Sequence, residues 1–511
     1  MRYSIPYIFI ICLIFSSCKS STSKTPEPET VTEQYRPQVH FTPKSKWMND
    51  PNGMVYFNDR YHLFYQHYPD STIWGPMHWG HASSVDLVNW EHHPIALYPD
   101  SLGYIFSGSA VVDVSNSSGF GQDGKPPLVA IFTHHDPKGE HEGKTDYQNQ
   151  SIAYSVDEGK TWTKYSDNPV LKNPGFKDFR DPKVSWHPAT QKWIMTLAVQ
   201  DRISFYSSPD LKTWNKESDF GQGIGAHGGV WECPDLFPLT YRGDSVWVLL
   251  VSINPGGPNG GSATQYFTGQ FDGTKFIPND TSTRWVDYGP DNYAGVTWSN
   301  TGARKIFMGW MSNWQYANQV PTKSWRSAMT IPRELLLVDA GGRYALVSKP
   351  VTEFDALTDN TASLENISVK GEYDLSASIK TSSSVAKLEL QIDDLNDFSI
   401  KLSNAEGELV EIGYDKAANR YYIDRSKSGE TGFEKGFAGR HFAPRLYPSK
   451  TANLTLICDQ TSIELFADNG LTVMTSIFFP GTPLTNYIIS SVNGIGIREL
   501  VYSELKPAVV R

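Results

Sequence analysis

The stretch SVDLVNW (residues 84–90) decides the fold class of this chain, because similar stretches return downstream as SVDEGKTW (155–162) and SPDLKTW (208–214). A fainter copy, FDGTKF, occupies residues 271–276. In a chain of short strands, such a repeat indicates repeated four-stranded units and hence a β-propeller, with loop insertions that account for the long spacing. The alternative is a coincidence of recurrent hairpin turns.

Strand-like segments dominate the sequence around these repeats. Examples are YHLFY (61–65), KWIMTL (192–197) and VWVLLV (246–251), each rich in β-branched or aromatic residues and bounded by turn residues. No long amphipathic pattern is present, which predicts an all-β protein. From about residue 350 the Asp-to-Trp repeat ends, and alternating segments such as KLELQI (387–392) are typical of a β-sandwich.

These changes in sequence pattern divide the chain into domains. We expect a propeller with the functional site over 38–348, a polar linker over 349–365 and a supporting sandwich over 366–511. The length of 511 residues fits two or three domains, and 39% hydrophobic with 20% charged residues describes a folded globular protein. A net charge of −10 without a cluster of Lys and Arg argues against a nucleic-acid partner.

The first residues resemble an export signal. Arg2 precedes an apolar run that ends at Ser16-Ser17-Cys18, and small residues before a cysteine resemble a bacterial lipoprotein signal in which Cys18 carries the lipid. Phe15 stands where such signals usually carry Leu, so plain secretion is the alternative. We expect a signal peptide over 1–18, a disordered tether over 19–37, and membrane contact only through the lipid.

Removal of Cys12 and lipidation of Cys18 would leave Cys233 and Cys458 in the folded part, which disfavours a disulfide framework. Their spacing matches no metal site. His134, His135 and His141 share a polar segment, but their spacing is not that of a ligand set, and we expect a solvated loop near the rim of the site. No metal or cofactor is predicted.

Three acids have unusual neighbours. Asp50 lies in WMNDPNG (47–53), Asp181 in FRDP (179–182) and Glu232 in WECPD (231–235). Each acid alone could be structural, as a turn residue or a surface ion pair. A propeller, however, gathers residues of different blades at one end of its axis, so the three could converge.

Glycoside hydrolysis requires two carboxyl groups beside the scissile bond, about 5–5.5 Å apart in retaining enzymes. The attacking group must be ionised, which suits Asp50 beside the amide of Asn49. The proton donor must be protonated, and apolar neighbours such as Trp231 and Pro234 would favour that form of Glu232. Asp181, beside Arg180, could hold sugar hydroxyls and stabilise positive charge in the transition state.

Together these three motifs resemble the signatures of family 32 of the glycoside hydrolases, the invertases, inulinases and levanases that cleave β-fructofuranosides. The segments FYQH (64–67), WG (74–75), FSGS (106–109), GPDNYA (289–294) and GWMSNW (309–314) are also similar and follow in the family's order. The resemblance runs from about residue 40 to the C-terminus. It implies a five-bladed propeller with a C-terminal sandwich and a retaining double displacement.

By motif position, the resemblance implies that Asp50 is the nucleophile, Glu232 the acid/base and Asp181 the transition-state stabiliser. The implied sugar-binding residues are Trp47, Asn49, Gln66, Trp74, Phe106, Ser107, Arg180, Tyr293 and Trp314.

We expect a fructan β-fructosidase that releases fructose by exo action on levan or inulin, and possibly on sucrose. An endo-levanase that releases oligosaccharides is the nearest alternative. A fructan-binding lipoprotein without turnover is a second. An inverting five-bladed enzyme of the arabinan type, with carboxyl groups roughly 6.5–9.5 Å apart, is a third. The sequence carries no expectation for the oligomeric state.

Overall fold

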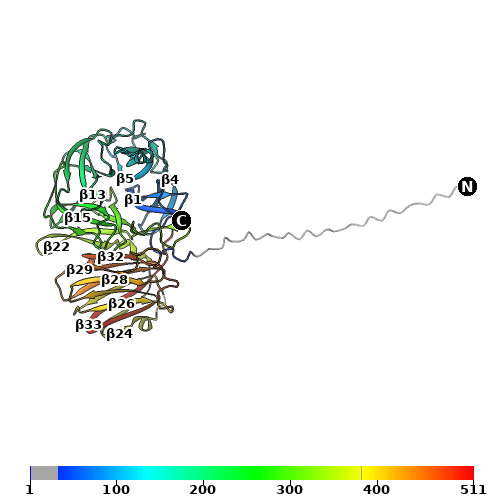
Figure 1. Ribbon diagram of the computed structural model, residues 1–511, viewed down its shortest axis with the longest axis vertical. Helices are drawn as coiled ribbons and strands as arrows, with labels where there is room; N and C mark the ends of the chain where they lie inside the picture. The colour runs from blue at the N-terminus through cyan, green and yellow to red at the C-terminus, as the bar shows by residue number, and fades with distance from the viewer. Residues whose placement is uncertain (2–32, 381–382, 511) are drawn as a thin grey trace. The chain divides into compact units, whose positions relative to one another are not determined.

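Five small sheets, arranged around an axis, occupy residues 46–350 and lie beside the sheet of the C-terminal part (Figure 1). The structure is a computed structural model that describes residue 1, residues 33–380 and residues 383–510. The described residues from Tyr35 onward form one compact unit. The predicted signal peptide, most of the tether and Cys18 lie outside the described residues. The end of the predicted tether is folded, because Tyr35 packs edge-on against Phe479 with ring centroids 5.3 Å apart.

Each blade is an antiparallel sheet. The first contains β1 (Lys46–Phe57), β2 (Arg60–Tyr68), β3 (His78–Ser84) and β4 (Glu91–Leu97), with β20 (Trp325–Arg326) parallel to β1. The second contains β5 (Tyr104–Val112), β6 (Leu128–His135), β7 (Gln148–Ser155) and β8 (Thr163–Lys164). The third contains β9 (Phe179–His187), β10 (Lys192–Val199), β11 (Arg202–Ser208) and β12 (Asn215–Phe220).

The fourth blade contains β13 (Val230–Tyr241), β14 (Asp244–Asn254), β15 (Ala263–Phe271), β16 (Phe276–Pro278) and β17 (Arg284–Trp285). The fifth contains β18 (Tyr293–Thr297), β19 (Ile306–Met311), β21 (Ala328–Met329), β22 (Arg333–Asp339) and β23 (Tyr344–Pro350). The innermost strands β1, β5, β9, β13 and β18 contact one another in this order, and β18 returns to β1, which closes the ring. The predicted five-bladed propeller is confirmed.

The repeated Asp-containing stretches form the turns between the third and fourth strands of four blades. Asp86 Oδ1 accepts hydrogen bonds from the backbone N–H groups of residues 88 and 89. Asp210 and Asp272 each accept from the N–H groups two and three positions onward, and Asp157 accepts from that of Thr161. The repeat therefore has a local cause, a carboxylate that satisfies the turn's own backbone donors.

The C-terminal sheet folds over its own core, whose buried residues come from strands on both sides. It contains β24 (Thr358–Asp374), β25 (Ala386–Ile392), β26 (Phe398–Ser403), β27 (Leu409–Asp415), β28 (Arg420–Lys427), β29 (Arg440–Pro444), β30 (Ala452–Asp459), β31 (Ser462–Ala467), β32 (Thr472–Ile477) and β33 (Asn486–Leu505). One end of β33 pairs with β26 and the other with β25, so this long strand joins the two layers of the predicted sandwich.

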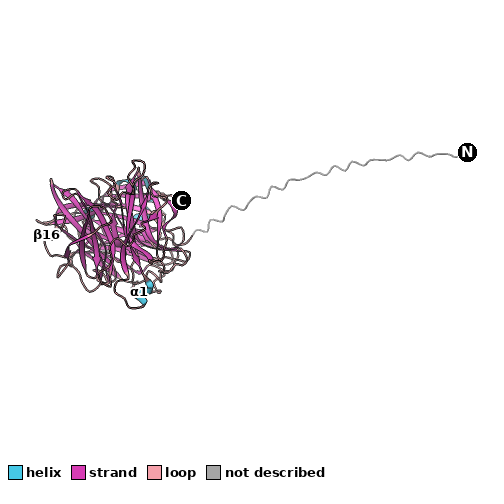
Figure 2. Cartoon of the chain, turned by 90° about the horizontal axis from the view of Figure 1, so that it is seen from above, coloured by secondary structure: helices cyan, strands magenta, loops and turns pink. Residues whose placement is uncertain are grey.

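The expected linker is shorter than 349–365. Residues 349 and 350 are the last two residues of β23, and η1 (Thr352–Leu357) follows. Residues 358–365 already pair with β33 as part of β24. The other short helices are α1 (Pro137–His141), α2 (Leu375–Ile379) and η2 (Asp468–Gly470). Strands make up nearly all of the regular structure (Figure 2). Among the described residues, no helix combines the length and apolar character needed to cross a membrane.

Buried ion pairs join the propeller to the sandwich. Arg333 of β22 donates to Asp287 Oδ2 (2.9 Å) in the propeller and, through Nε, to Glu464 Oε2 (3.0 Å) of β31. His40 lies between Asp459 and Glu464. Burial lowers the pKa of His40, but the hydrogen bonds and negative charges of these two carboxylates outweigh it and raise the pKa to about 9. The interface is therefore held by charges that lose their compensation if one partner is removed.

Candidate active site

Each of the five innermost strands has a β-bulge at an equivalent position, where two residues oppose one residue of the neighbouring strand. The bulged pairs are Asn49–Asp50, Phe106–Ser107, Asp181–Pro182, Cys233–Pro234 and Ala294–Gly295. A bulge redirects side chains, so these positions turn toward the axis of the propeller. The backbone at Asp181 and Cys233 has positive φ angles of 62° and 44°, a conformation that costs non-glycine residues on the order of 1 kcal/mol and recurs at functional sites.

The bulges surround a cavity of about 250 Å³ that contains all three predicted acids. All the predicted sugar-binding residues except Trp47 and Tyr293 line it with them. The cavity also exposes residues that sequence reasoning did not assign to the site: His135, Glu140, Tyr147, Gln148 and Asp178.

Asp50 is surrounded by hydrogen-bond donors. Asn49 Nδ2 donates to Oδ1 (2.9 Å), Ser107 Oγ donates to Oδ2 (2.8 Å), and Cys233 Sγ donates to Oδ2 at 3.4 Å. Burial and the negative charge of Glu232 raise the pKa of Asp50, while these hydrogen bonds lower it, and the net direction is upward. The predicted donors are therefore present and offset part of the cost of a buried carboxylate.

Asp181 occupies the most buried position of the three acids. Its Oδ2 accepts from the backbone N–H of Cys233 (3.1 Å) and lies 3.6 Å from Cys233 Sγ, whose single proton is shared with Asp50. Burial raises the pKa of Asp181 to about 7, against the lowering effect of Arg180 and with a further rise from Glu232 and Asp50. The thiol of Cys233, expected beside Glu232, thus lies between the other two carboxylates.

Glu232 has polar partners. Arg180 donates to Oε1 from Nε (3.1 Å) and Nη2 (2.9 Å), and the hydroxyl of Tyr293 donates to Oε2. The prediction of apolar neighbours is wrong, because Trp231 packs into the core of its blade and donates from Nε1 to the carbonyl of Ala226 (2.9 Å). Successive strand residues point to opposite faces, so Trp231 and Glu232 cannot share one environment.

Trp47 and Tyr293 lie behind the cavity wall, which corrects their expected direct contact with sugar. Trp47 is fully buried, donates from Nε1 to Asn49 Oδ1 (2.7 Å) and stacks on Trp314 with ring centroids 5.9 Å apart. Tyr293 is 1% exposed and reaches the site through Glu232. Both position residues that do line the cavity.

Aromatic rings form one side of the cavity. Trp74 is 39% exposed and meets Phe106 edge-on, with centroids 6.1 Å apart. Phe106 stacks on His135 at 4.2 Å with an interplanar angle of 6°. Exposed aromatic faces beside carboxylates and amides form a polar pocket with an apolar wall, an arrangement suited to the hydroxyls and C–H faces of a sugar.

The histidines expected in a solvated loop are placed differently. His134 and His135 are buried at the end of β6, and only His141 lies on the following short helix α1. The sequence does contain a signal for Asp178, because alternation in an extended segment places residue 178 on the same face as residue 180. In the structure, Arg180 Nη1 donates to Asp178 Oδ1 (2.6 Å). No motif or spacing marks Glu140 or Tyr147.

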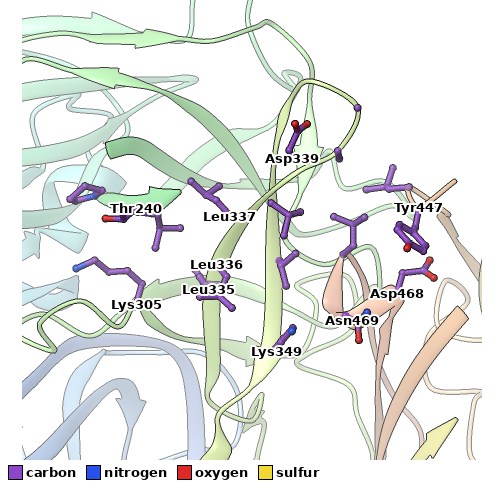
Figure 3. Close-up of a pocket in the computed structure, with 18 of the residues that line it drawn as sticks. Thr240, Lys305, Leu335, Leu336, Leu337, Asp339, Lys349, Tyr447, Asp468 and Asn469 are labelled. Carbon is purple, nitrogen blue, oxygen red and sulfur yellow. The ribbon is translucent and has the colours of Figure 1, made fainter. Parts of the chain in front are cut away.

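Figure 3 shows another cavity, of about 870 Å³, where β22 of the propeller approaches the sandwich. Leu335, Leu336 and Leu337 line it together with Tyr447 and Asp468 of the sandwich. It is larger, but none of the three acids lines it. The smaller cavity is the candidate site, because convergent polar groups and perturbed carboxyl groups mark chemistry better than volume does.

Comparison with known proteins agrees with this geometry. The profile described as Glycosyl hydrolases family 32 N-terminal domain matches residues 40–350, and that described as Glycosyl hydrolases family 32 C terminal matches residues 353–504. A levanase of Bacillus subtilis (strain 168) is 45% identical over 93% of this chain and 71% of its own length. An extracellular exo-inulinase of Aspergillus awamori is 39% identical over 90% of this chain and 93% of its own.

Solved structures give the same result. The crystal structure of the exo-inulinase from Aspergillus awamori has a TM-score of 0.85, with 36% identity, and the alignment covers 93% of this chain and 98% of that one. A β-fructofuranosidase from Schwanniomyces occidentalis, complexed with fructosyl-erythritol, has a TM-score of 0.84 with 34% identity and the same coverage. The chain belongs to family 32 of the glycosyl hydrolases, as the resemblance of its motifs predicted.

Proposed function

We propose that this protein hydrolyses β-D-fructofuranosyl linkages of fructans and sucrose with retention of configuration. The observation that carries the proposal is the convergence of Asp50, Asp181 and Glu232 from three blades into one cavity. Relatives named levanase and exo-inulinase, and a solved relative bound to fructosyl-erythritol, support the same substrate class.

In the first step, Asp50 attacks the anomeric carbon, and the bond to the leaving oxygen breaks as Glu232 gives that oxygen its proton. In the second, Glu232 takes a proton from water, and the resulting hydroxide displaces Asp50 and releases fructose. Arg180 and Tyr293 hold Glu232 in place from both of its oxygens. Asp181 accepts from the sugar hydroxyls and stabilises the positive charge that develops on the ring.

We further propose exo action, in which one terminal fructose enters at a time. A cavity of about 250 Å³ is smaller than the roughly 300–1,000 Å³ typical of sites for larger ligands. This size supports binding of a single sugar unit on the Asp50 side rather than a run of several.

The test is a time course with levan, inulin and sucrose, in which products are resolved by length. Fructose alone from the start is expected, and Asp50→Asn should release none while keeping the wild-type circular dichroism spectrum. An early ladder of oligomers would contradict exo action. A wild-type protein that binds fructan but releases no sugar would contradict the enzymatic function itself.

We also propose that the protein is exported and tethered by a lipid on Cys18. The apolar run that ends at Ser16-Ser17-Cys18 supports this, and the relative from Aspergillus awamori is named extracellular. The mass of the mature N-terminus tests the proposal, because an unmodified Cys18 in the mature protein would refute the lipid anchor.

A further inference from the structure

Glu140 is an acid of the active-site cavity that the mechanism above does not use. It belongs to α1, in the segment between β6 and β7 of the second blade, and it lines the cavity that contains Asp50 and Glu232. Its side chain is 49% exposed, so it remains open to a ligand.

Hydrogen bonds hold the Glu140 carboxylate in one place. Gln148 Oε1 accepts from the N–H of Phe179 (2.9 Å), which leaves its amide nitrogen to donate to His135 Nδ1 (3.3 Å). Because Nδ1 accepts, the ring proton is on Nε2, which faces Glu140 Oε2 at 3.1 Å. Burial, the charge of Glu140 and a hydrogen bond to it raise the pKa of Tyr147 to about 12, so Tyr147 stays protonated beside it.

The segment that carries Glu140 is closed at its base. The N–H of Asp136 donates to the carbonyl of Tyr147 (2.8 Å), and Asp136 Oδ1 caps α1 by accepting from the N–H of Lys138 (3.0 Å). The chain packs so tightly that a Cβ on Gly139 would lie 2.7 Å from Asp136 Oδ2. Glu140 is therefore presented by an ordered turn, and its position is reproducible from one molecule to the next.

Hydrogen bonds connect the surroundings of Glu140 to Glu232. Gln148, which donates to His135, accepts from the N–H of Phe179, and the next residue, Arg180, donates to Glu232 Oε1 (2.9 Å). Glu232 protonates the leaving oxygen in the proposed mechanism, so the departing sugar must lie on the Glu232 side of the cavity. A carboxylate offers about four acceptor positions, and the two donors described above leave others for sugar hydroxyls.

We propose that Glu140, positioned by His135 and Tyr147, binds hydroxyl groups of the departing sugar and so determines which leaving group the enzyme accepts. This inference rests on the proposed function, because it assigns a role within the same site. In this proposal the α1 segment recognises the leaving sugar and takes no part in bond cleavage.

The test compares substrates with and without a leaving-group sugar. Glu140→Gln and Glu140→Ala are assayed with sucrose, short fructan oligomers and a nitrophenyl β-fructofuranoside. Because a hydrogen bond to a charged group is worth about 1.5–3 kcal/mol, kcat/KM for the sugar substrates should fall roughly 10- to 100-fold in Glu140→Ala. The value for the nitrophenyl substrate should change less than about two-fold, since its leaving group has no sugar hydroxyls to lose.

The matched control is Glu142→Gln. Glu142 lies two residues onward, pairs with Lys144 at 3.0 Å and does not line the cavity, so all substrates should keep their wild-type kcat/KM. Glu140→Gln keeps the shape of the side chain and an acceptor oxygen, so a smaller but still selective loss is expected even if the alanine variant folds poorly.

An equal loss on both substrate classes, or no loss on either, would overturn the role of Glu140 while leaving the hydrolase function intact. A wild-type protein inactive on every fructoside would overturn both.

Discussion

Burial of the Asp181 carboxylate lowers the stability of the folded protein, and a single substitution that removes its charge should restore that stability. Its pKa is raised from 3.8 to about 7, chiefly by burial, so the folded protein retains a proton that the unfolded chain gives up at lower pH. Between about pH 4 and 7 the unfolded state therefore binds fewer protons, and stability falls as pH rises through this window. Above pH 7 the whole cost is present.

The size of this destabilisation follows from the difference between the pKa values of Asp181 in the unfolded and folded states. Each pKa unit corresponds to about 1.4 kcal/mol, so the change from 3.8 to about 7 corresponds to at most about 4 kcal/mol at pH 8. Asparagine has the same shape and no charge to bury. Asp181→Asn should thus abolish turnover but gain stability over the wild type, and this gain should be larger at pH 8 than at pH 4 by a few degrees in Tm.

The assay is thermal unfolding of both proteins at pH 4, 6 and 8. Asp210→Asn is the matched control, because partial burial raises the pKa of Asp210 but the N–H groups of Thr213 and Lys212 outweigh it and lower the pKa. A lowered pKa stabilises the folded state above about pH 4, so this variant should lose stability at pH 8 and lose less toward acidic pH. A Tm difference for Asp181→Asn that is the same at all three pH values, or negative at pH 8, would show that the buried Asp181 carboxylate does not destabilise the fold.

Three further predictions concern other parts of the protein. Cys233→Ala removes a donor that lowers the pKa of Asp50, so the acidic limb of kcat/KM against pH should move to higher pH, and Cys233→Ser should restore it; an unmoved limb would contradict this. Trp74→Ala should reduce kcat/KM for fructan about 10-fold, mainly through KM. Unchanged kinetics would show that Trp74 does not contact the sugar. Arg333→Met leaves buried carboxylates uncompensated and should cost about 3–5 kcal/mol in the free energy of unfolding by denaturant, while a neutral result would mean that the interface does not depend on this ion pair.

The features that the sequence predicted well have local causes. The repeated Asp-containing stretches mark one turn in four blades because each aspartate bonds to backbone N–H groups two to four residues onward. Asp50 and Asp181 were recognisable because their neighbours in the chain, Asn49 and Arg180, are also their neighbours in the site. Alternation likewise predicted the strands of the sandwich.

The remaining features depend on contacts across the fold. Bulges and positive φ angles turn the chain at Asp181 and Cys233, and residue spacing does not reveal which way a bulge directs a thiol. Residues 358–365 resemble a linker because most of them are exposed, although their backbone pairs with β33. Glu140 has no motif because its partners, His135 and Tyr147, meet it only when the second blade forms.

The proposed double displacement requires Asp50 as its nucleophile. The most direct measurement traps the covalent intermediate, with Glu232→Gln to slow its hydrolysis and a nitrophenyl β-fructofuranoside, whose good leaving group needs little acid catalysis, to form it. Mass spectrometry of the quenched and digested protein should find one added fructosyl group, located on Asp50 within residues 47–53. A rapid release of nitrophenol with no adduct, or an adduct on Asp181, would show that Asp50 is not the nucleophile.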